Sequence, residues 1–143
     1  MKKVFLSLLI AASFAANATE DVNRIILQNF KADFKYAKNV SWTNSDQFVK
    51  ARFTEMDVQM EAFYTPSGEL IGVSKNAELE SLPKNSAKYI LSKYASYKMG
   101  EVIAYESATE GLSHFVSLED GKEKLVLEIG QTGSVSVFKR TWK

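Results

Sequence analysis

Short runs in which apolar and polar residues alternate are the feature that most restricts how this sequence can fold. Every second residue is apolar in 49–54 and again in 58–64. Side chains of a β-strand point alternately to opposite faces, so a period of two predicts strands with one buried face. Further strands are expected at about 40–43, 70–74, 101–107, 113–119, 124–129 and 134–141. The turn sequences Pro66-Ser67-Gly68, Asp120-Gly121 and Thr132-Gly133 lie between strands and predict tight reversals of the chain.

Two other segments have the longer period of an amphipathic helix. Apolar residues recur every fourth position at Val22, Ile26, Phe30 and Phe34, which predicts a helix over about 21–37 with Asp21 as its N-cap. A second helix is expected to start at Pro83, whose missing N–H is tolerated in a first turn, and to end before Gly100. Its core-facing residues are Ala87, Ile90, Leu91 and Tyr94.

The two halves of the chain match when one is shifted by 65 residues. Residues 49–53 then fall on 114–118, residues 60–64 on 125–129, and Gly68 on Gly133. Identity is low, so alternation alone accounts for part of the match. The expected fold class is α+β: two tandem helix-plus-four-strand repeats forming an antiparallel sheet with both helices packed on one face. Repeat one would span about 21–75 and repeat two about 83–142.

The first eighteen residues have the organisation of a secretory signal peptide. Lys2 and Lys3 precede the apolar stretch Val4–Ala12, and Ala16-Asn17-Ala18 offers small residues at a cleavage site. A membrane-spanning helix would need about 20 apolar residues, roughly twice this length. We therefore expect residues 1–18 to be removed, residues 19–143 to form a single domain, no membrane insertion after cleavage, and a periplasmic or secreted location.

Composition excludes several classes of function. Removing Lys2 and Lys3 from the 18 basic residues leaves 16 against 17 acidic ones, a net charge of −1. A nearly neutral chain lacks the overall basic charge of a nucleic-acid-binding protein, so no nucleic-acid partner is expected. The sequence has no cysteine, which excludes disulfides, thiol catalysis and thiolate metal sites. No cofactor is expected.

Four segments stand out by their order and spacing: NVSWTNSDQFVKARF, EAFYTPSGELIG, LPKNSAKYILSKY and FVSLEDGKEKLVLEI. Over about 34–139 they resemble the PepSY-like domain of small secreted bacterial proteins. That family is grouped with the β-lactamase-inhibitor-protein-like fold. The resemblance implies helix-plus-four-strand repeats, an exported location and no known catalysis. Inhibition of β-lactamase belongs to a branch with disulfides, so that activity is not implied for a chain without cysteine.

No catalytic or metal-binding pattern is present in the sequence. His114, the one histidine, is expected on the core-facing side of a strand with a structural role, because a zinc site needs three or four ligands. Asp120-Gly121-Lys122-Glu123 is a fragment of a calcium loop and is interpreted as a solvated turn. No G-x-S-x-G nucleophile elbow occurs. The chain is therefore not expected to be an enzyme or to bind a metal.

The sheet face opposite the helices carries more aromatic residues than a solvated face needs. Contiguous apolar surface edged by charge marks interaction sites, and aromatic residues with arginine dominate binding energies. The candidate partner-binding residues are Phe48, Lys50, Arg52, Glu61, Phe63, Tyr105, Phe115, Phe138 and Arg140. The leading hypothesis is a non-enzymatic binding or inhibitory module holding a protein or peptide of the cell envelope on this face. The alternatives are a structural or self-associating envelope domain, which includes a homo-oligomer, and plain aromatic packing within the sheet.

Overall fold

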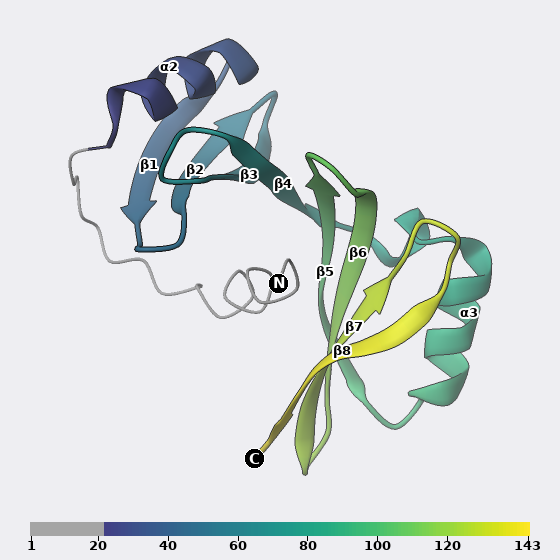
Figure 1. Ribbon diagram of the computed structural model, residues 1–143. Helices are drawn as coiled ribbons and strands as arrows, with labels where there is room; N and C mark the ends of the chain where they lie inside the picture. The colour runs from purple at the N-terminus through teal and green to yellow at the C-terminus, as the bar shows by residue number, and fades with distance from the viewer. Residues whose placement is uncertain (1–21) are drawn as a thin grey trace. The chain divides into compact units, whose positions relative to one another are not determined.

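The computed structural model of the protein describes residues 22–143, so the expected signal peptide and Asp21 lie outside the described residues. Within this range the chain forms two α-helices, a short 3₁₀-helix and eight strands (Figure 1). In chain order these are α2 (Arg24–Asp33), β1 (Lys38–Asn44), β2 (Val49–Glu55), β3 (Val58–Tyr64), β4 (Leu70–Ala77), the 3₁₀-helix η1 (Leu79–Ser81), α3 (Lys84–Lys93), β5 (Lys98–Ser107), β6 (Gly111–Glu119), β7 (Glu123–Ile129) and β8 (Val135–Trp142).

The predicted strands are all confirmed, and both helices are shorter than predicted. Helix α2 begins at Arg24 because the side chain of Asn23 accepts a hydrogen bond from the Ile25 N–H at 2.9 Å. The helix ends at Asp33, and the Phe34 N–H still bonds the Phe30 carbonyl at 2.8 Å. Pro83 stands immediately before the first residue of α3. The apolar period therefore located each helix, while the capping contacts set its length.

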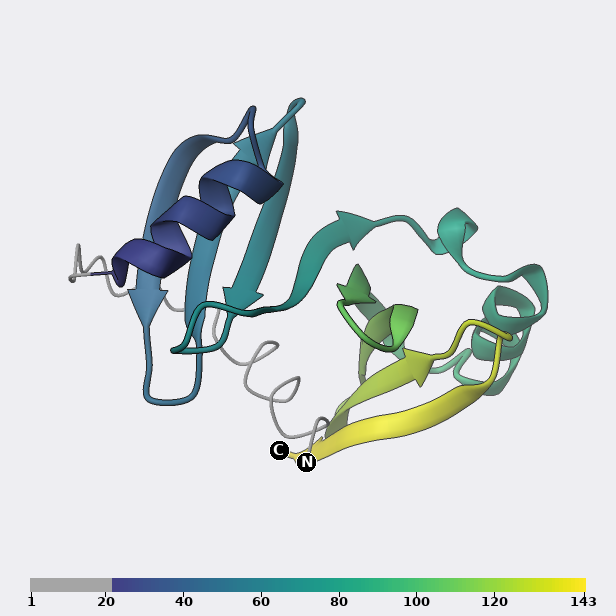
Figure 2. The ribbon, with the colours of Figure 1, turned by 45° about the horizontal axis from the view of Figure 1, so that its top comes forward.

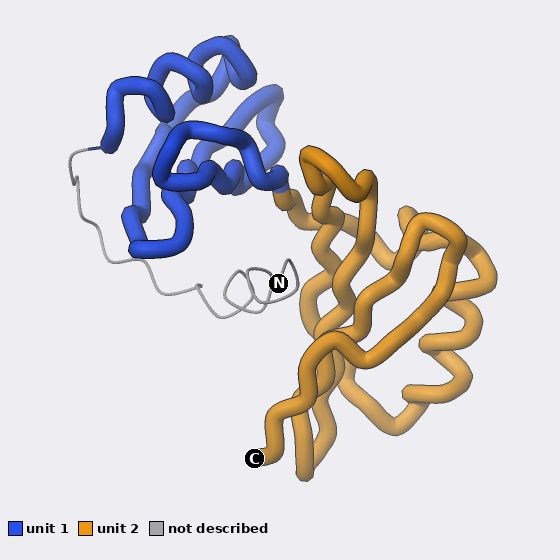
Figure 3. Tube along the Cα trace, viewed as in Figure 1, with its two compact units in different colours: residues 1–73 blue, residues 74–143 orange. Residues whose placement is uncertain are grey.

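The described residues divide into two compact units, 22–73 and 74–143 (Figure 3). In the first unit α2 lies across strands β1 to β3 (Figure 2). Ile26 and Phe30 of the helix are buried against Ala51, Phe53 and Tyr64 of the sheet. The rings of Phe30 and Phe53 meet edge to face, with centroids 5.0 Å apart.

The turn before β4 is tied to α2 in the first unit. Gly68 adopts φ +106°, and a Cβ there would lie 2.7 Å from Ile25 Cγ2. Both the backbone conformation and the lack of space for a side chain therefore require glycine at this position. The Asn29 side-chain amide donates to the Gly68 carbonyl at 2.8 Å, and the Tyr64 hydroxyl donates to Asp33 Oδ2 at 2.9 Å. The predicted turn chemistry thus also fixes where the helix sits on its strands.

The second unit has its own core beneath α3. Ile90 is fully buried with an apolar set drawn from strands β5 to β7: Val102, Val116, Leu118, Leu125, Leu127 and Ile129. The Ser86 hydroxyl, itself buried, donates to the carbonyl of Gly133 at 2.8 Å. Gly133 has φ +88° in the turn before β8, where glycine is the residue that adopts this conformation at least cost.

The predicted fold class, two tandem helix-plus-four-strand repeats with both helices packed on one face, is wrong. The structure has one eight-stranded sheet in which the strands follow in the order β1 to β8. Strand β4 cannot be assigned to one repeat, because Leu70 and Val73 pack on the first core whereas Ala77 packs on the second. The two cores share no residue, so the helices do not cover a common core. Alternation and turn glycines specify each hairpin locally, and they carry no information on how the strands are divided between cores.

Candidate functional site

Five of the predicted site residues lie together in the first unit, on the β2–β3 face that points away from α2. Lys50 is opposite Phe63 and Arg52 is opposite Glu61 in the strand register. The rings of Phe48 and Phe63 meet edge to face, with centroids 5.8 Å apart. The register therefore brings these residues onto one patch, as the alternation predicted.

Most of this patch is nonetheless buried. The exposed fractions of Phe48, Lys50 and Phe63 are 4%, 6% and 1%, so these side chains are not available to a partner. The predicted exposure of the two aromatic residues is wrong, and aromatic packing, the alternative interpretation, describes their contact better.

The exposed part of the first-unit patch is polar. Glu61 lies between two cations, with Lys50 Nζ at 3.8 Å and Arg52 Nε at 3.9 Å. With its amide oriented to satisfy both groups, the Gln59 oxygen also accepts from Arg52 Nε at 2.7 Å. Because the Arg52 side chain keeps 47% of its surface exposed, it presents a guanidinium that is held in place by its neighbours.

Three predicted aromatic residues gather on the second unit, on the face of strands β5 to β8 that points away from α3. Phe115 of β6 is 3% exposed and meets Phe138 of β8 edge to face, with centroids 5.3 Å apart. Phe138 and Tyr105 are half-buried. Burial, with the charge of Glu110 as a smaller cause, raises the pKa of the Tyr105 hydroxyl, which stays protonated at neutral pH. The aromatic surface open to a partner is therefore narrower than predicted: it consists of Tyr105 and of Phe138, whose ring meets the buried Phe115.

Arg140 does not belong to this face. The register of β7 with β8 shifts between Val126 and Leu127, which leaves Phe138 as the extra residue of a bulge. Beyond the bulge Arg140 lies opposite Leu125, a residue of the core beneath α3. The prediction for Arg140 assumed an unbroken period of two, and one extra residue reverses which face a side chain takes.

Arg140 instead forms part of a cluster around Glu123, which the sequence interpretation left as a solvated turn. Glu123 is 6% exposed. Its Oε1 accepts from the Tyr97 hydroxyl at 2.5 Å, and Arg140 Nε lies 3.1 Å from Oε2, close enough for an ion pair although not aligned as a hydrogen bond. The hydrogen bond to Glu123 raises the pKa of Tyr97 to about 12. In the sequence, Glu123 is two residues before Leu125 and four before Leu127, so strand alternation places it on the same buried face.

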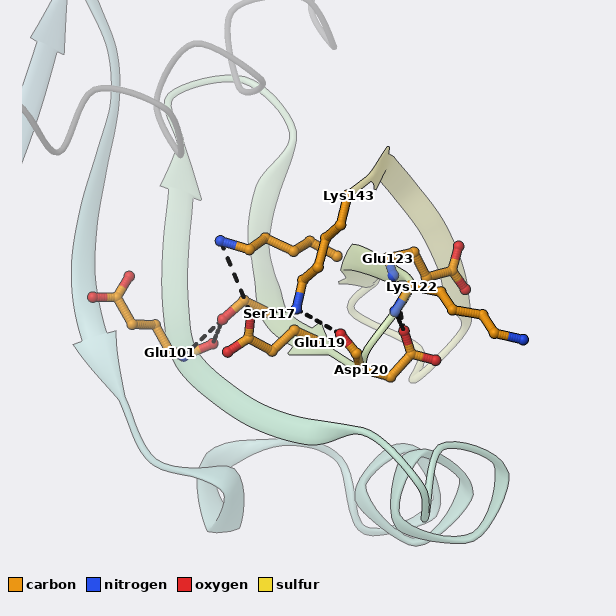
Figure 4. Close-up of polar contacts among 8 residues, drawn as sticks. Glu101, Ser117, Glu119, Asp120, Lys122, Glu123 and Lys143 are labelled. Carbon is orange, nitrogen blue, oxygen red and sulfur yellow. Dashed lines mark hydrogen bonds and ion pairs between the residues drawn. The ribbon is translucent and has the colours of Figure 1, made fainter.

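The neighbouring turn is held by Asp120 (Figure 4). Its Oδ1 accepts from the N–H groups of Lys122 and Glu123 at 2.7 and 2.8 Å, and these two bonds lower the pKa of the Asp120 carboxyl. Lys143 Nζ donates to the Asp120 carbonyl at 2.6 Å and lies 3.4 Å from Glu119 Oε2. Asp120 Oδ1 and the Asp120 carbonyl oxygen are thus both engaged within the protein.

The histidine and carboxylate side chains of the described residues do not gather as metal ligands would. Within 22–143 no group of three or more histidine, aspartate or glutamate side chains is arranged to hold an ion. His114 is 8% exposed on β6, opposite Ala104 and Ile129, and burial lowers its pKa. The predicted core-facing position of His114 is confirmed.

The fold defined by this sheet and its helices is that of BLIP-like proteins. A BLIP-like protein from Bacteroides fragilis superposes with a TM-score of 0.73 at 16% identity, over 87% of this chain and 89% of its own. A DUF2874 family protein from Bacteroides ovatus gives a TM-score of 0.74 at 16% identity, over 86% and 89% of the two chains. A structure from Bacteroides eggerthii described with the words "putative periplasmic proteins" gives 0.74 at 11% identity, over 86% and 90%.

The predicted BLIP-like fold is confirmed by these neighbours, whose low identities show a shared fold and no more. No protein-family model matches the chain and no curated protein matches it, so the PepSY-like resemblance stays a prediction. Within residues 22–143 no helix has the length and apolarity to span a bilayer.

Proposed function

We propose that this protein is an exported, non-enzymatic binding or inhibitory module that holds a protein or peptide of the cell envelope. The observation that carries the proposal is the face of the second unit opposite α3. There Tyr105 and Phe138 are half-buried and Phe138 is braced by Phe115 at 5.3 Å. A rigid, partly exposed aromatic ring supported from below gives large contact area at little entropic cost on binding.

The location is part of the same proposal. The signal-peptide pattern of residues 1–18 supports export, and one neighbour of the same fold is described as periplasmic in the words quoted above. The BLIP-like fold of the neighbours supports a binding module over an enzyme. Arg52 and Glu61 of the first unit are a second, polar surface that a partner could contact, because both side chains retain exposure of 47% and 25%.

The test compares capture of envelope proteins by immobilised protein and by two single variants on β8. Phe138→Asp places a charge on the aromatic face. Val137→Asp, the matched control, changes the neighbouring residue, which is 46% exposed and lies opposite Leu127 on the other side of the strand. A partner retained by wild type and Val137→Asp and lost by Phe138→Asp supports the proposal. The proposal fails if every protein retained by wild type is retained equally by Phe138→Asp, with folding of both variants checked by circular dichroism.

Self-association is distinguished by measuring mass in solution at two concentrations. A dimer that dissociates on Phe138→Asp and persists on Val137→Asp would assign the face to a second copy of this chain. That outcome would replace the proposed partner with the structural alternative.

A further inference from the structure

The near-neutral charge of the whole chain conceals a basic segment around α3. Residues 81–100 contain four lysines and no aspartate or glutamate. Lys84, Lys88, Lys93 and Lys98 are all exposed. Among residues 22–143 none of the ion pairs formed involves any of the four. The segment therefore presents a local positive charge that no carboxylate within the described protein neutralises by contact.

The exposed side of α3 also carries two large apolar side chains among these lysines. Tyr89 is 43% exposed, and Leu91, which the helical period wrongly predicted on the core side, is 55% exposed. At 3.6 residues per turn, Lys84, Lys88 and Leu91 share one flank of the helix, while Tyr89 and Lys93 share the other. Lys93 Nζ lies 2.8 Å from the Tyr89 hydroxyl and 5.3 Å from the centre of its ring. We call the exposed side chains of Lys84, Lys88, Tyr89, Leu91 and Lys93 the α3 surface; Lys98, opposite Glu119 in the register of β5 with β6, lies on the other face of the sheet.

We propose that the α3 surface docks on an anionic phospholipid bilayer. Lysines on a helix beside exposed leucine and tyrosine are the composition of helices that lie in the membrane interface. Their ammonium groups attract anionic head groups, while the apolar side chains enter the boundary with the acyl chains. Such peripheral contact is distinct from insertion, for which α3, at ten residues, is too short.

A lipid surface fits this side of the molecule better than an acidic protein does. A protein partner is held by buried anchor residues in a fitted pocket, whereas the α3 surface is the outer side of a single helix. Lipid head groups supply many anionic charges over a broad area, which suits three exposed lysines spread along α3 from Lys84 to Lys93. This surface lies on the α3 side of the second unit, so it is independent of the aromatic face proposed for a protein partner.

The experiment measures co-sedimentation of the protein with vesicles of phosphatidylcholine containing about one third phosphatidylglycerol, at low salt. Residues 19–143 are used, because the apolar stretch Val4–Ala12 would itself enter lipid. Each lysine near an anionic surface strengthens binding about fivefold, so Lys84→Gln/Lys88→Gln should weaken it roughly 25-fold. The matched control, Lys122→Gln/Lys124→Gln, removes the same charge from two exposed residues at the β6–β7 turn and should weaken binding less than about threefold.

Three results would overturn the proposal. The first is absence of binding to the phosphatidylglycerol vesicles, and the second is equal binding to vesicles of phosphatidylcholine alone. The third is equal weakening by the two double variants, which would mean that net charge and not the α3 surface governs binding. If the vesicles are ignored and polyglutamate is bound in a Lys84- and Lys88-dependent manner, the site belongs to an acidic protein and the lipid assignment is wrong. Phe138→Asp should leave vesicle binding unchanged, which separates this proposal from the proposed function.

Discussion

His114 shows how one buried side chain couples this fold to pH. The imidazole is 8% exposed on β6, and burial lowers its pKa below the ordinary value of 6.5 because the charged form loses its hydration. The folded state therefore binds a proton less readily than the unfolded state does. The stability that results is fully present above the unfolded pKa and is lost as pH falls through the folded pKa.

We expect the free energy of unfolding to fall as the pH is lowered from about 7.5 to about 5.5, a range in which histidine is the main side chain that titrates. Urea unfolding at several pH values measures the effect, and NMR of the single imidazole gives its folded pKa directly. His114→Gln should remove the pH-dependence in this range while keeping a polar side chain of similar reach. An imidazole that titrates at or above 6.5 in the folded protein would contradict the burial argument.

For single residues, the sequence predicts which face of the sheet a side chain takes only while the strand continues without a bulge. Alternation along the strand predicts the correct face for His114 and for Phe138. Alternation alone also predicts that Glu123 is buried, although the neighbouring Asp120-Gly121 sequence indicates a solvated turn. Arg140 was misplaced because the bulge at Phe138 arises from pairing with β7, a contact between distant residues. Near-complete burial of Phe63 depends on tertiary packing in the same way.

Among the elements, the β2–β3 turn departs most from the residues expected for its geometry. Met56 and Asp57 have φ of 49° and 63°, and Glu55 pairs with Val58. Two central residues with positive φ define a type I′ turn, for which Asn-Gly is the preferred sequence. Met56 is also 78% exposed, so its side chain gains little from packing.

We expect Met56→Asn/Asp57→Gly to stabilise the protein by about 1 kcal/mol, because the replaced residues carry the steric cost of the left-handed conformation. Thermal or urea unfolding measures the difference. Met56→Ala is the control, since alanine keeps the unfavourable conformation and should give little gain. Equal stability of the double variant and wild type would show that the turn is not strained.

The elements themselves were predictable because their causes are local. Strand alternation and the turns at Gly68 and Gly133 are properties of a few neighbouring residues, and the structure places a strand at each predicted run. Helix ends were less predictable: Asn23 caps α2, whereas the predicted cap was Asp21, which lies outside the described residues. The division of strands between two cores had no local signal.

For the molecule as a whole, the two separate cores predict that substitutions in one and in the other have additive effects on the free energy of unfolding. Ile26 of α2 and Ile90 of α3 are both fully buried, and they have no core neighbour in common. Substitutions that share no partners normally contribute independently to stability.

Ile26→Ala and Ile90→Ala should each lower the free energy of unfolding by about 2–5 kcal/mol. The double variant should lose the sum of the two within about 0.5 kcal/mol. Unfolding by urea gives all three values, with wild type as reference and the exposed Ile25→Ala as a control of small effect. An interaction energy above about 1 kcal/mol would show that the cores are coupled through the sheet.

Strand β4 places a restriction on how such a chain can be shortened or rearranged by evolution. Its first residues complete one core and Ala77 joins the other, although the compact units divide within it, between Val73 and Ser74. A gene break at that point would end one product in mid-strand and start the other there, leaving unpaired backbone at both new termini. A break that keeps the strand whole must fall before Leu70 or after Ala77. The first would separate Leu70 and Val73 from the first core, and the second would separate Ala77 from the second core. No single cut of the chain at β4 therefore leaves the strand whole and both cores complete.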